Sequence, residues 1–475
     1  MLNTLNDVLN NVDNFIWGMP LIILILFTGI LLTVRLRGLQ VRHLGKALHY
    51  VFHNEDDGEG EVTSFGALCT ALSATIGTGN IVGCATAIVA GGPGALFWMW
   101  LAAFFGMATK YAEGMLAVKY RVIAEDGHAL GGPFYYIEKG MGKNFKWLAK
   151  LFCIFGTMVG LFGIGTFTQV NGITSAVNNF FDSSNVHTIS LFGMNYSISV
   201  VVAGIIVTVC AGLVIIGGIK RISKVSEIIV PFMAVTYIGV CLLIVLTHLP
   251  QVPVAFGQII QSAFGLKAAA GGAIGAMTVA MQKGIARGIF SNEAGLGSAP
   301  IAAAAAQTNE PVRQGLVSMT GTFIDTIIVC TMTGLAIVMT GAWDMGLEGV
   351  AVTTKAFALG LPFPAKVSAF ILMMCLVFFA FTTILGWAYY SERCLEYLVN
   401  GKKFVITVFK WLYILAVFIG PFMTVSAVWT IADICNGLMA FPNLVALLAL
   451  NGDVVSETRG YLERIGIMKT AVDEA

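Results

Sequence analysis

The chain has 475 residues, of which 57% are hydrophobic and only 11% are charged, whereas an ordinary soluble domain is roughly 25% charged. With a mean hydropathy of +0.84 and 54 glycines, this composition excludes a soluble globular protein and predicts an all-α polytopic membrane protein. The 27 Lys and Arg residues are balanced by 26 Asp and Glu residues, which excludes the basic surface that nucleic-acid binding requires.

The first apolar run, residues 15–34, predicts a membrane-spanning helix. It is long enough to cross a hydrocarbon core of roughly 30 Å, and it lacks the positively charged segment that opens a signal peptide. We therefore expect an extra N-terminal anchor helix. Ten further apolar runs of about 20 residues predict ten more spans. They are residues 64–90, 94–119, 147–180, 196–217, 226–247, 270–300, 312–341, 364–398, 404–420 and 424–450.

The eleven predicted spans form a single transmembrane domain, residues 1–475, and their orientation follows from the positions of Lys and Arg. Residues 1–34 contain neither, whereas four follow the first span directly: Arg35, Arg37, Arg42 and Lys46. Later basic residues fall on the same side in this arrangement: Lys119, Arg121, Lys220, Arg221, Lys224, Arg313, Arg393, Lys402, Lys403, Arg459, Arg464 and Lys469. Because short cytoplasmic loops hold the excess of Lys and Arg, we expect the N-terminus outside and the tail, residues 451–475, in the cytoplasm.

The ten spans that follow the anchor helix divide into two groups of five, residues 64–247 and 270–450. Because each group has an odd number of spans, the second lies inverted relative to the first, which is a transporter architecture. The first helix of each group is interrupted by glycines, at residues 73–83 and 284–297. Broken helices at corresponding positions predict a binding site near the middle of the membrane.

Around Gly77 and Gly79 an unwound chain would expose backbone groups that lipid cannot solvate, so a polar ligand is expected there. The N-terminus of the continuing half-helix suits a carboxylate, and freed carbonyls with side-chain oxygens suit Na⁺. The side chains that supply such oxygens are Ser73, Thr75, Thr78 and Asn80. Glycine spacing is also typical of close helix packing, which is the alternative.

In the second interrupted helix, Asn292 and Glu293 place polar groups near the middle of a span. An ionisable group there costs at least about 2.5 kcal/mol unless it is paired or hydrated, so Glu293 should face a cavity or a partner. Lys283 and Arg287 precede it on the same helix and could pair with it or line a path to the cytoplasm. A purely structural ion pair is the alternative.

Three further side chains could line a site. Gln169 can both donate to and accept from a ligand, although a hydrogen bond between helices is equally consistent with it. Thr383 and Trp387 share one helix face at a spacing of four residues, which suits a cation ligand beside a pocket wall. Threonine also commonly bonds back to its own helix, and tryptophan often simply packs.

Asp325 and Asp433 are intramembrane acids, which makes them candidate proton carriers, with satisfied structural roles as the alternative. The chain lacks the H-E-x-x-H, G-x-x-x-x-G-K-[ST] and G-x-S-x-G motifs of common enzyme classes. We therefore expect that it is not an enzyme.

The sixteen residues from Gly91 to Gly106 resemble the signature of the sodium:alanine symporters of bacteria and archaea, the alanine or glycine:cation symporter family. Residues 73–83, 291–300 and 386–393 are also similar to that family. The resemblance implies the five-plus-five inverted-repeat fold of the bacterial leucine transporter with one extra helix. It also implies uptake of small neutral amino acids with co-transported Na⁺ across the cytoplasmic (inner) membrane of a prokaryote.

The resemblance further implies positions for the ligands. One Na⁺ would bind the carbonyls of Ser73 and Ile76 and the hydroxyls of Thr382 and Thr383, and analogy adds a second near Thr75 and Asn80. Thr78 and Gly79 would hold the substrate carboxylate, and the Phe290 carbonyl and Asn292 its ammonium. Gln169 would add a polar contact, and Trp387 would form the wall near the substrate side chain.

We therefore expect an electrogenic Na⁺:amino-acid symporter that favours alanine and glycine and works by alternating access. Its partners would be small neutral amino acids and membrane lipids. A proton-coupled symporter is the first alternative, because of Asp325 and Asp433. A channel and a membrane enzyme are further alternatives, although the chain lacks a repeated carbonyl filter and the catalytic motifs named above.

Overall fold

The computed structural model describes residues 2–53, 58–124, 127–191, 194–265, 272–423 and 426–466. Residues 270 and 271 of the predicted second repeat and residues 467–475 of the predicted tail lie outside the described residues. Within the described ranges the fold is helical apart from two antiparallel hairpins and one isolated bridge. The hairpins pair β1 (Val122–Ile123) with β2 (Ala129–Leu130) and β3 (Thr188–Leu191) with β4 (Met194–Ser197). The predicted helical class is confirmed.

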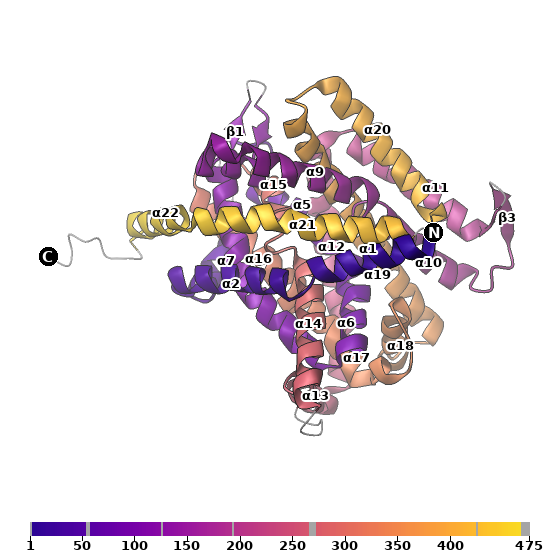
Figure 1. Ribbon diagram of the computed structural model, residues 1–475. Coiled ribbons are helices and arrows are strands. Elements are labelled where there is room, and N and C mark those ends of the chain that lie inside the picture. Colours follow the sequence, from indigo (N-terminus) through magenta and orange to yellow (C-terminus); the bar gives the residue numbers. More distant parts are fainter. Residues whose placement is uncertain are drawn as a thin grey trace.

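The N-terminal anchor consists of α1 (Leu2–Ile16) and α2 (Met19–Arg35). Residues Asn6–Arg35 are together long and apolar enough to cross a membrane, so a span is present where it was predicted. A proline in the first turn of α2 suits a helix start, because the first amides of a helix have no partner within it. Figure 1 shows α1 and α2 running alongside α21 (Ser426–Ala449).

Within the described residues, eight helices could cross a membrane, or nine if one bent pair counts as a span. The protein is thus a polytopic membrane protein, but eleven spans are not all recovered. The two predicted spans outside this set, residues 94–119 and 270–300, correspond to α7 (Gly94–Lys119) and α14 (Ala273–Asn292). Neither helix contains an 18-residue stretch apolar enough to count as a span, and Lys110 and Glu113 of α7 and Lys283 and Arg287 of α14 lower the hydropathy of those stretches.

The predicted span 147–180 is two helices, α9 (Lys146–Phe162) and α10 (Phe167–Phe181). Between them, Gly165 packs so closely that a Cβ atom there would lie 2.6 Å from both the Trp387 Cβ and the Tyr413 hydroxyl. The Tyr413 hydroxyl donates to the Gly165 carbonyl at 2.7 Å. A side chain from α20 (Lys403–Ile419) therefore satisfies backbone that the interruption frees.

Both predicted helix breaks are confirmed. The first separates α5 (Ser64–Thr75) from η1 (Gly79–Gly83) and α6 (Cys84–Gly91), and the two halves are bent by 53°. The second lies between α14 and α15 (Ala299–Ala303). There Glu293, Gly295 and Gly297 have positive φ angles of 56°, 89° and 80°. Left-handed residues of this kind cannot continue a right-handed helix, so the chain unwinds.

The remaining elements complete the helical bundle. In chain order they are α3 (Leu39–Arg42), α4 (Leu44–Phe52), α8 (Pro133–Tyr136), η2 (Ile137–Met141), η3 (Lys143–Phe145), α11 (Ile198–Ile215), α12 (Gly218–Thr247), η4 (Leu249–Gln251), α13 (Val252–Ala263), α16 (Pro311–Thr322), η5 (Phe323–Cys330), α17 (Thr331–Thr340), η6 (Ala342–Asp344), α18 (Val350–Gly360), α19 (Ala365–Leu398), η7 (Gly420–Phe422) and α22 (Asn451–Arg464). The short helix α18 lies between the predicted spans 312–341 and 364–398.

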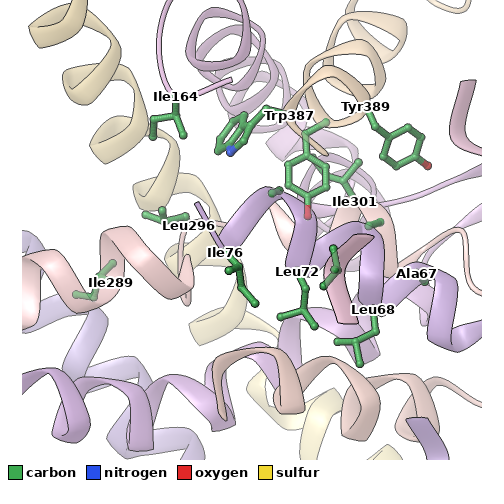
Figure 2. Close-up of a cluster of buried hydrophobic side chains, with 14 of the residues drawn as sticks. Ala67, Leu68, Leu72, Ile76, Ile164, Ile289, Leu296, Ile301, Trp387 and Tyr389 are labelled. Atoms are coloured by element: carbon green, nitrogen blue, oxygen red, sulfur yellow. The ribbon is translucent and has the colours of Figure 1, made fainter. Parts of the chain in front are cut away.

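The largest buried hydrophobic cluster includes residues from both helix breaks. Ile76 from the first break, Leu296 from the second and Trp387 from α19 are all at most 1% exposed and belong to this cluster. Figure 2 shows these side chains within one region of the core. Both breaks are thus held within this buried cluster.

Candidate functional site

The first break packs directly on α19 and α10 at Gly77. A Cβ atom at this position would lie 2.5 Å from the Thr383 hydroxyl and 3.5 Å from the Gln169 side-chain oxygen. Only glycine allows the backbone to come this close. The bare backbone of the break therefore faces two polar side chains that the sequence had singled out.

Two of the four predicted Na⁺ ligands lie near each other in the structure. The Thr383 hydroxyl is 3.5 Å from the Ile76 carbonyl and donates to the Phe379 carbonyl at 3.0 Å. Ile76 has an extended backbone with ψ of 94°, so its carbonyl leaves the direction of the α5 axis. A hydroxyl and a freed carbonyl are oxygen ligands of the kind that hard cations accept.

The other two predicted ligands bond within their own helices through their side chains. The Thr382 hydroxyl contacts the carbonyls of Phe378 and Phe379 at 3.1 and 3.0 Å. The Ser73 hydroxyl donates to the Thr70 carbonyl at 2.7 Å. The Thr382 hydroxyl keeps its acceptor lone pairs, because these bonds use only its hydrogen atom, and the ligand predicted from Ser73 is its backbone carbonyl.

Gln169 is 2% exposed, and its side-chain oxygen has no hydrogen-bond partner among the described residues. A buried polar atom without a partner is costly, typically about 1–3 kcal/mol. Because this oxygen faces Gly77, a donor such as an ammonium group would satisfy it at the break.

Asn80, on the far side of the first break, reaches the π-helical segment η5. Its Nδ2 donates to Oδ1 of Asp325 at 2.7 Å, and its Oδ1 accepts from the Gly77 amide at 2.9 Å. The other Asp325 oxygen accepts from Ser291 at 2.9 Å and from Thr326 at 2.7 Å. One buried carboxylate thus joins η5 to both broken helices.

Thr75 and Asn80, named together for a second Na⁺, have different partners. The Thr75 hydroxyl donates to the Ala71 carbonyl at 2.5 Å and lines a small cavity beside Lys110 and Gln314. Asn80 bonds Asp325 instead. The structure therefore places the Asn80 side chain with an acid and the Thr75 side chain with its own helix.

The substrate residues predicted at the breaks are adjacent. A Cβ atom on Gly79 would lie 3.6 Å from the Phe290 ring, and a Cβ atom on Gly172 of α10 would lie 3.0 Å from the Thr78 methyl group. Asn292 donates to Thr326 at 3.1 Å and accepts from the Ala294 amide at 2.9 Å. Gly79 therefore lies against α14, Thr78 lies against α10, and Asn292 is held by η5.

Glu293 is paired differently from either expected ion pair. One of its carboxylate oxygens accepts from the Trp387 indole at 3.0 Å, and the other accepts from the Ser298 hydroxyl at 2.6 Å. Within the described chain, neither Lys283 nor Arg287 pairs with it. Those two basic side chains line a separate cavity with Asp433.

Glu113 of α7 is a site residue that the sequence reasoning missed. Its Oε1 accepts from the Gly295 amide at 3.1 Å and from Asn443 of α21 at 2.6 Å. Asn443 also donates to the Gly295 carbonyl at 2.9 Å and accepts from the Tyr136 hydroxyl. Glu113 thereby fixes the second break, and a charged residue inside a predicted span was the available signal.

The buried charges around the breaks do not balance. Glu113, Glu293 and Asp325 are each at most 2% exposed, whereas Lys110, at 3% exposed, is the basic residue whose charge acts on all three. Buried carboxylates need compensation by positive charge or protons. The region is therefore short of positive charge and suited to binding a cation.

At the end of α5 remote from the break, Arg121 binds four backbone carbonyls. Its guanidinium donates to the carbonyls of Ala304, Ala306, Glu59 and Thr308 at 2.9, 2.6, 2.6 and 2.7 Å. Residue 62 also bonds the segment after α15, because its carbonyl accepts from the Gln307 amide at 2.7 Å. The two broken helices are thus fastened together at this end.

A titratable pair lies beside this junction. Glu61 is 3.1 Å from the His128 ring and accepts from the Ala129 amide at 3.0 Å. Burial alone would raise the pKa of the Glu61 carboxyl, but these hydrogen bonds and the His128 charge outweigh it and lower that pKa. The carboxylate is therefore held in its charged form.

The whole chain is similar in sequence to known transporters. A model of the sodium:alanine symporter family matches residues 2–474. An uncharacterized transporter of Haemophilus influenzae is 55% identical over 99% of both chains. The sodium/alanine symporter AgcS of Methanococcus maripaludis is 46% identical over 96% of this chain and 97% of its own. The probable sodium/glutamine symporter GlnT of Bacillus subtilis is 36% identical over 97% of this chain and 91% of its own. The chain therefore belongs to the sodium:alanine symporter family and is a multi-pass membrane transporter.

Proposed function

We propose that the protein is a Na⁺-coupled symporter that imports small neutral amino acids, principally alanine and glycine, by alternating access. The fold we propose for it is the five-plus-five inverted repeat of the leucine-transporter type, with residues 64–247 and 270–450 as the repeats. Residues 15–34 would be the extra helix. The proposed setting is a prokaryotic inner membrane, with the N-terminus outside and residues 451–475 inside.

The observation that carries this proposal is the packing of the first helix break against Gln169 and Thr383. Gly77 brings bare backbone against these two side chains, and the Gln169 oxygen there lacks a partner in the described structure. The excess of buried carboxylates around the two breaks also favours a bound cation. A zwitterion with a co-bound cation would supply both the missing donor and the missing positive charge.

The roles proposed for individual residues keep the assignments that the family resemblance implied. They are Na⁺ binding by Ser73, Ile76, Thr382 and Thr383, carboxylate binding by Thr78 and Gly79, and ammonium binding by Phe290 and Asn292. Gln169 is a further polar contact, and Trp387 is the pocket wall. The proximity of Thr383 to Ile76 supports the first set. For a second cation, the bonds of Asn80 favour a position near Asp325 over one at Thr75.

Two observations bear on related functions, namely transport of larger amino acids and coupling to H⁺. A relative named as a glutamine symporter is 36% identical, so the size of the accepted side chain is a local property of the pocket. The buried carboxylate of Asp325 could take a proton in place of a cation, which would make coupling to H⁺ the second candidate.

Uptake by proteoliposomes tests the proposal. Purified full-length protein would be reconstituted, and radiolabelled alanine uptake would be followed under an inward Na⁺ gradient, an inward H⁺ gradient or neither. We expect accumulation above the external concentration only with the Na⁺ gradient, and generation of an inward current because net charge moves. Accumulation driven by H⁺ alone would support the second candidate, and Na⁺ flux without alanine would indicate a channel.

A further inference from the structure

A cavity of about 220 Å³ lies where α1, α14 and α21 meet. Figure 1 shows α1 and α21 running together across one end of α14. The Trp17 indole, just after α1, donates to the Asp433 backbone carbonyl at 3.0 Å, which ties α1 to α21 beside the cavity. Cavities for drug-sized ligands begin at roughly 300 Å³, so this one suits a smaller molecule.

The cavity is lined by charges of both signs that are not paired with one another. Asp13 and Asp433 contribute carboxylates, and Lys283 and Arg287 contribute cations. In the described parts of the chain, none of these four side chains forms an ion pair or a side-chain hydrogen bond, and one Asp13 oxygen is buried without a partner. Asp13, Arg287 and Asp433 are partly buried and Lys283 is exposed, so a charged ligand can enter the cavity and replace the water around all four groups.

Phe290 is the wall between this cavity and the first helix break. Its ring lines the cavity, and the same ring would lie 3.6 Å from a Cβ atom on Gly79. The Arg287 guanidinium lies 5.6 Å from the centre of the ring, within the range of a cation–π contact. Phe290 thus borders both the cavity and the first helix break.

We propose that this charged cavity is a second amino-acid site, which holds the substrate zwitterion before it passes Phe290. Arg287 and Lys283 bind its carboxylate, and Asp13 and Asp433 bind its ammonium. The inference rests on the proposed function, since it takes the transported molecule to be a small zwitterion. A simple anion or a simple cation satisfies only half of the lining, so neither alone completes the site.

The geometry also assigns the order of events. Release from the cavity toward the break requires the Phe290 ring to turn, and this motion breaks its contact with Arg287. A site on the pathway changes the rate at which substrate reaches the central site and the rate at which it leaves by the same factor. Removal of the site therefore slows uptake but leaves equilibrium binding at the central site unchanged.

Equilibrium binding of radiolabelled alanine to the purified full-length protein in Na⁺ tests the second site. We expect two binding events per chain in the wild type. Asn292→Ala should remove the central event, and Arg287→Gln or Asp433→Asn should weaken the other by about tenfold or more, as expected for loss of a charged hydrogen bond. Lys366→Gln is the matched control, because Lys366 lines a different cavity and its loss should leave both events intact.

Uptake and competition complete the test. Arg287→Gln and Asp433→Asn should lower initial uptake at subsaturating alanine without changing affinity at the central site, and propionate or ethylamine alone should not displace alanine from the second site. A single event in the wild type that Asn292→Ala abolishes would overturn the second site and leave the proposed function standing. Two events that persist in both charge variants would also overturn it. Absence of any alanine binding would overturn both proposals.

Discussion

The indole nitrogen of Trp387 donates a 3.0 Å hydrogen bond to Glu293 and so joins α19 to the second helix break. The side chain is fully buried and packs in the same cluster as Ile76 and Leu296 (Figure 2). Trp387 therefore holds a carboxylate of the break in addition to its proposed role as the pocket wall.

Substitution of Trp387 separates these two roles. Trp387→Phe keeps an aromatic ring but removes the donor, so exclusion of leucine and valine should persist while alanine uptake falls. Trp387→Ala removes the ring, which typically costs about 3–5 kcal/mol of stability in a core, and should let larger amino acids compete. Competition of leucine and valine against labelled alanine, with thermal unfolding as the control for folding, measures both effects. Rejection of leucine by Trp387→Ala with unchanged alanine affinity would show that Trp387 does not line the pocket.

Removal of the Thr383 hydroxyl should weaken Na⁺ binding. Thr383→Val keeps the shape of the side chain but removes the oxygen 3.5 Å from the Ile76 carbonyl. We expect the Na⁺ concentration for half-maximal uptake to rise about tenfold, as for loss of one charged contact, and alanine affinity to fall by linkage. Thr28→Val is the control, because Thr28 is also buried and bonds its own helix but lies in α2. Equal Na⁺ dependence in the two variants would exclude Thr383 as a ligand.

The glycines of the first break should differ in their tolerance of a methyl group. Gly77→Ala would place Cβ 2.5 Å from the Thr383 hydroxyl, whereas the nearest atom to a Cβ on Gly79 is 3.5 Å away. We expect Gly77→Ala to abolish Na⁺-dependent alanine binding, Gly79→Ala to retain binding, and Gly79→Leu to block it. Gly83→Ala, which meets no atom within 4 Å, is the control. Normal binding by Gly77→Ala would mean that the break does not rely on this close approach.

Arg121 should control the separation of the segment before α5 from the segment after α15. Arg121→Gln removes donors to four carbonyls, among them Ala306 and Thr308. Hydrogen exchange of the Val62 and Gln307 amides should become at least about tenfold faster, since charged hydrogen bonds of about 1.5–3 kcal/mol are lost. Amides of α20 serve as the internal control. Unchanged exchange would show that the other backbone bonds suffice to hold this end closed.

The two helix breaks were predictable because the glycines that allow them can be read directly from the sequence. Gly77 and Gly79 flank the first interruption, and Gly295 and Gly297 adopt positive φ angles in the second. The interruption between α9 and α10 was not predicted, although Gly163 and Gly165 stand there, because the apolar residues on both sides predict one continuous span. There a distant group, the Tyr413 hydroxyl, satisfies the freed Gly165 carbonyl, and hydropathy does not report such partners.

The hydrogen-bond partners of the buried acids could not be predicted from the sequence for a similar reason. Lys283 and Arg287 were the expected partners of Glu293 because they precede it on the same helix. Glu293 instead accepts a hydrogen bond from Trp387, 94 residues later in the chain. Asp325 likewise bonds Asn80, 245 residues earlier. The choice among such partners depends on which faces of separate helices meet, and a single sequence carries no direct signal of those contacts.

The most direct test of the account is the mutual dependence of Na⁺ and alanine binding in the purified wild-type protein. Alanine affinity would be measured across a range of Na⁺ concentrations at constant ionic strength, with K⁺ as the replacement, and Na⁺ affinity would be measured with and without alanine. We predict that each ligand raises the affinity for the other by the same factor, as thermodynamic linkage between the two binding events requires. Alanine binding that is equally tight in K⁺ and in Na⁺ would contradict the account.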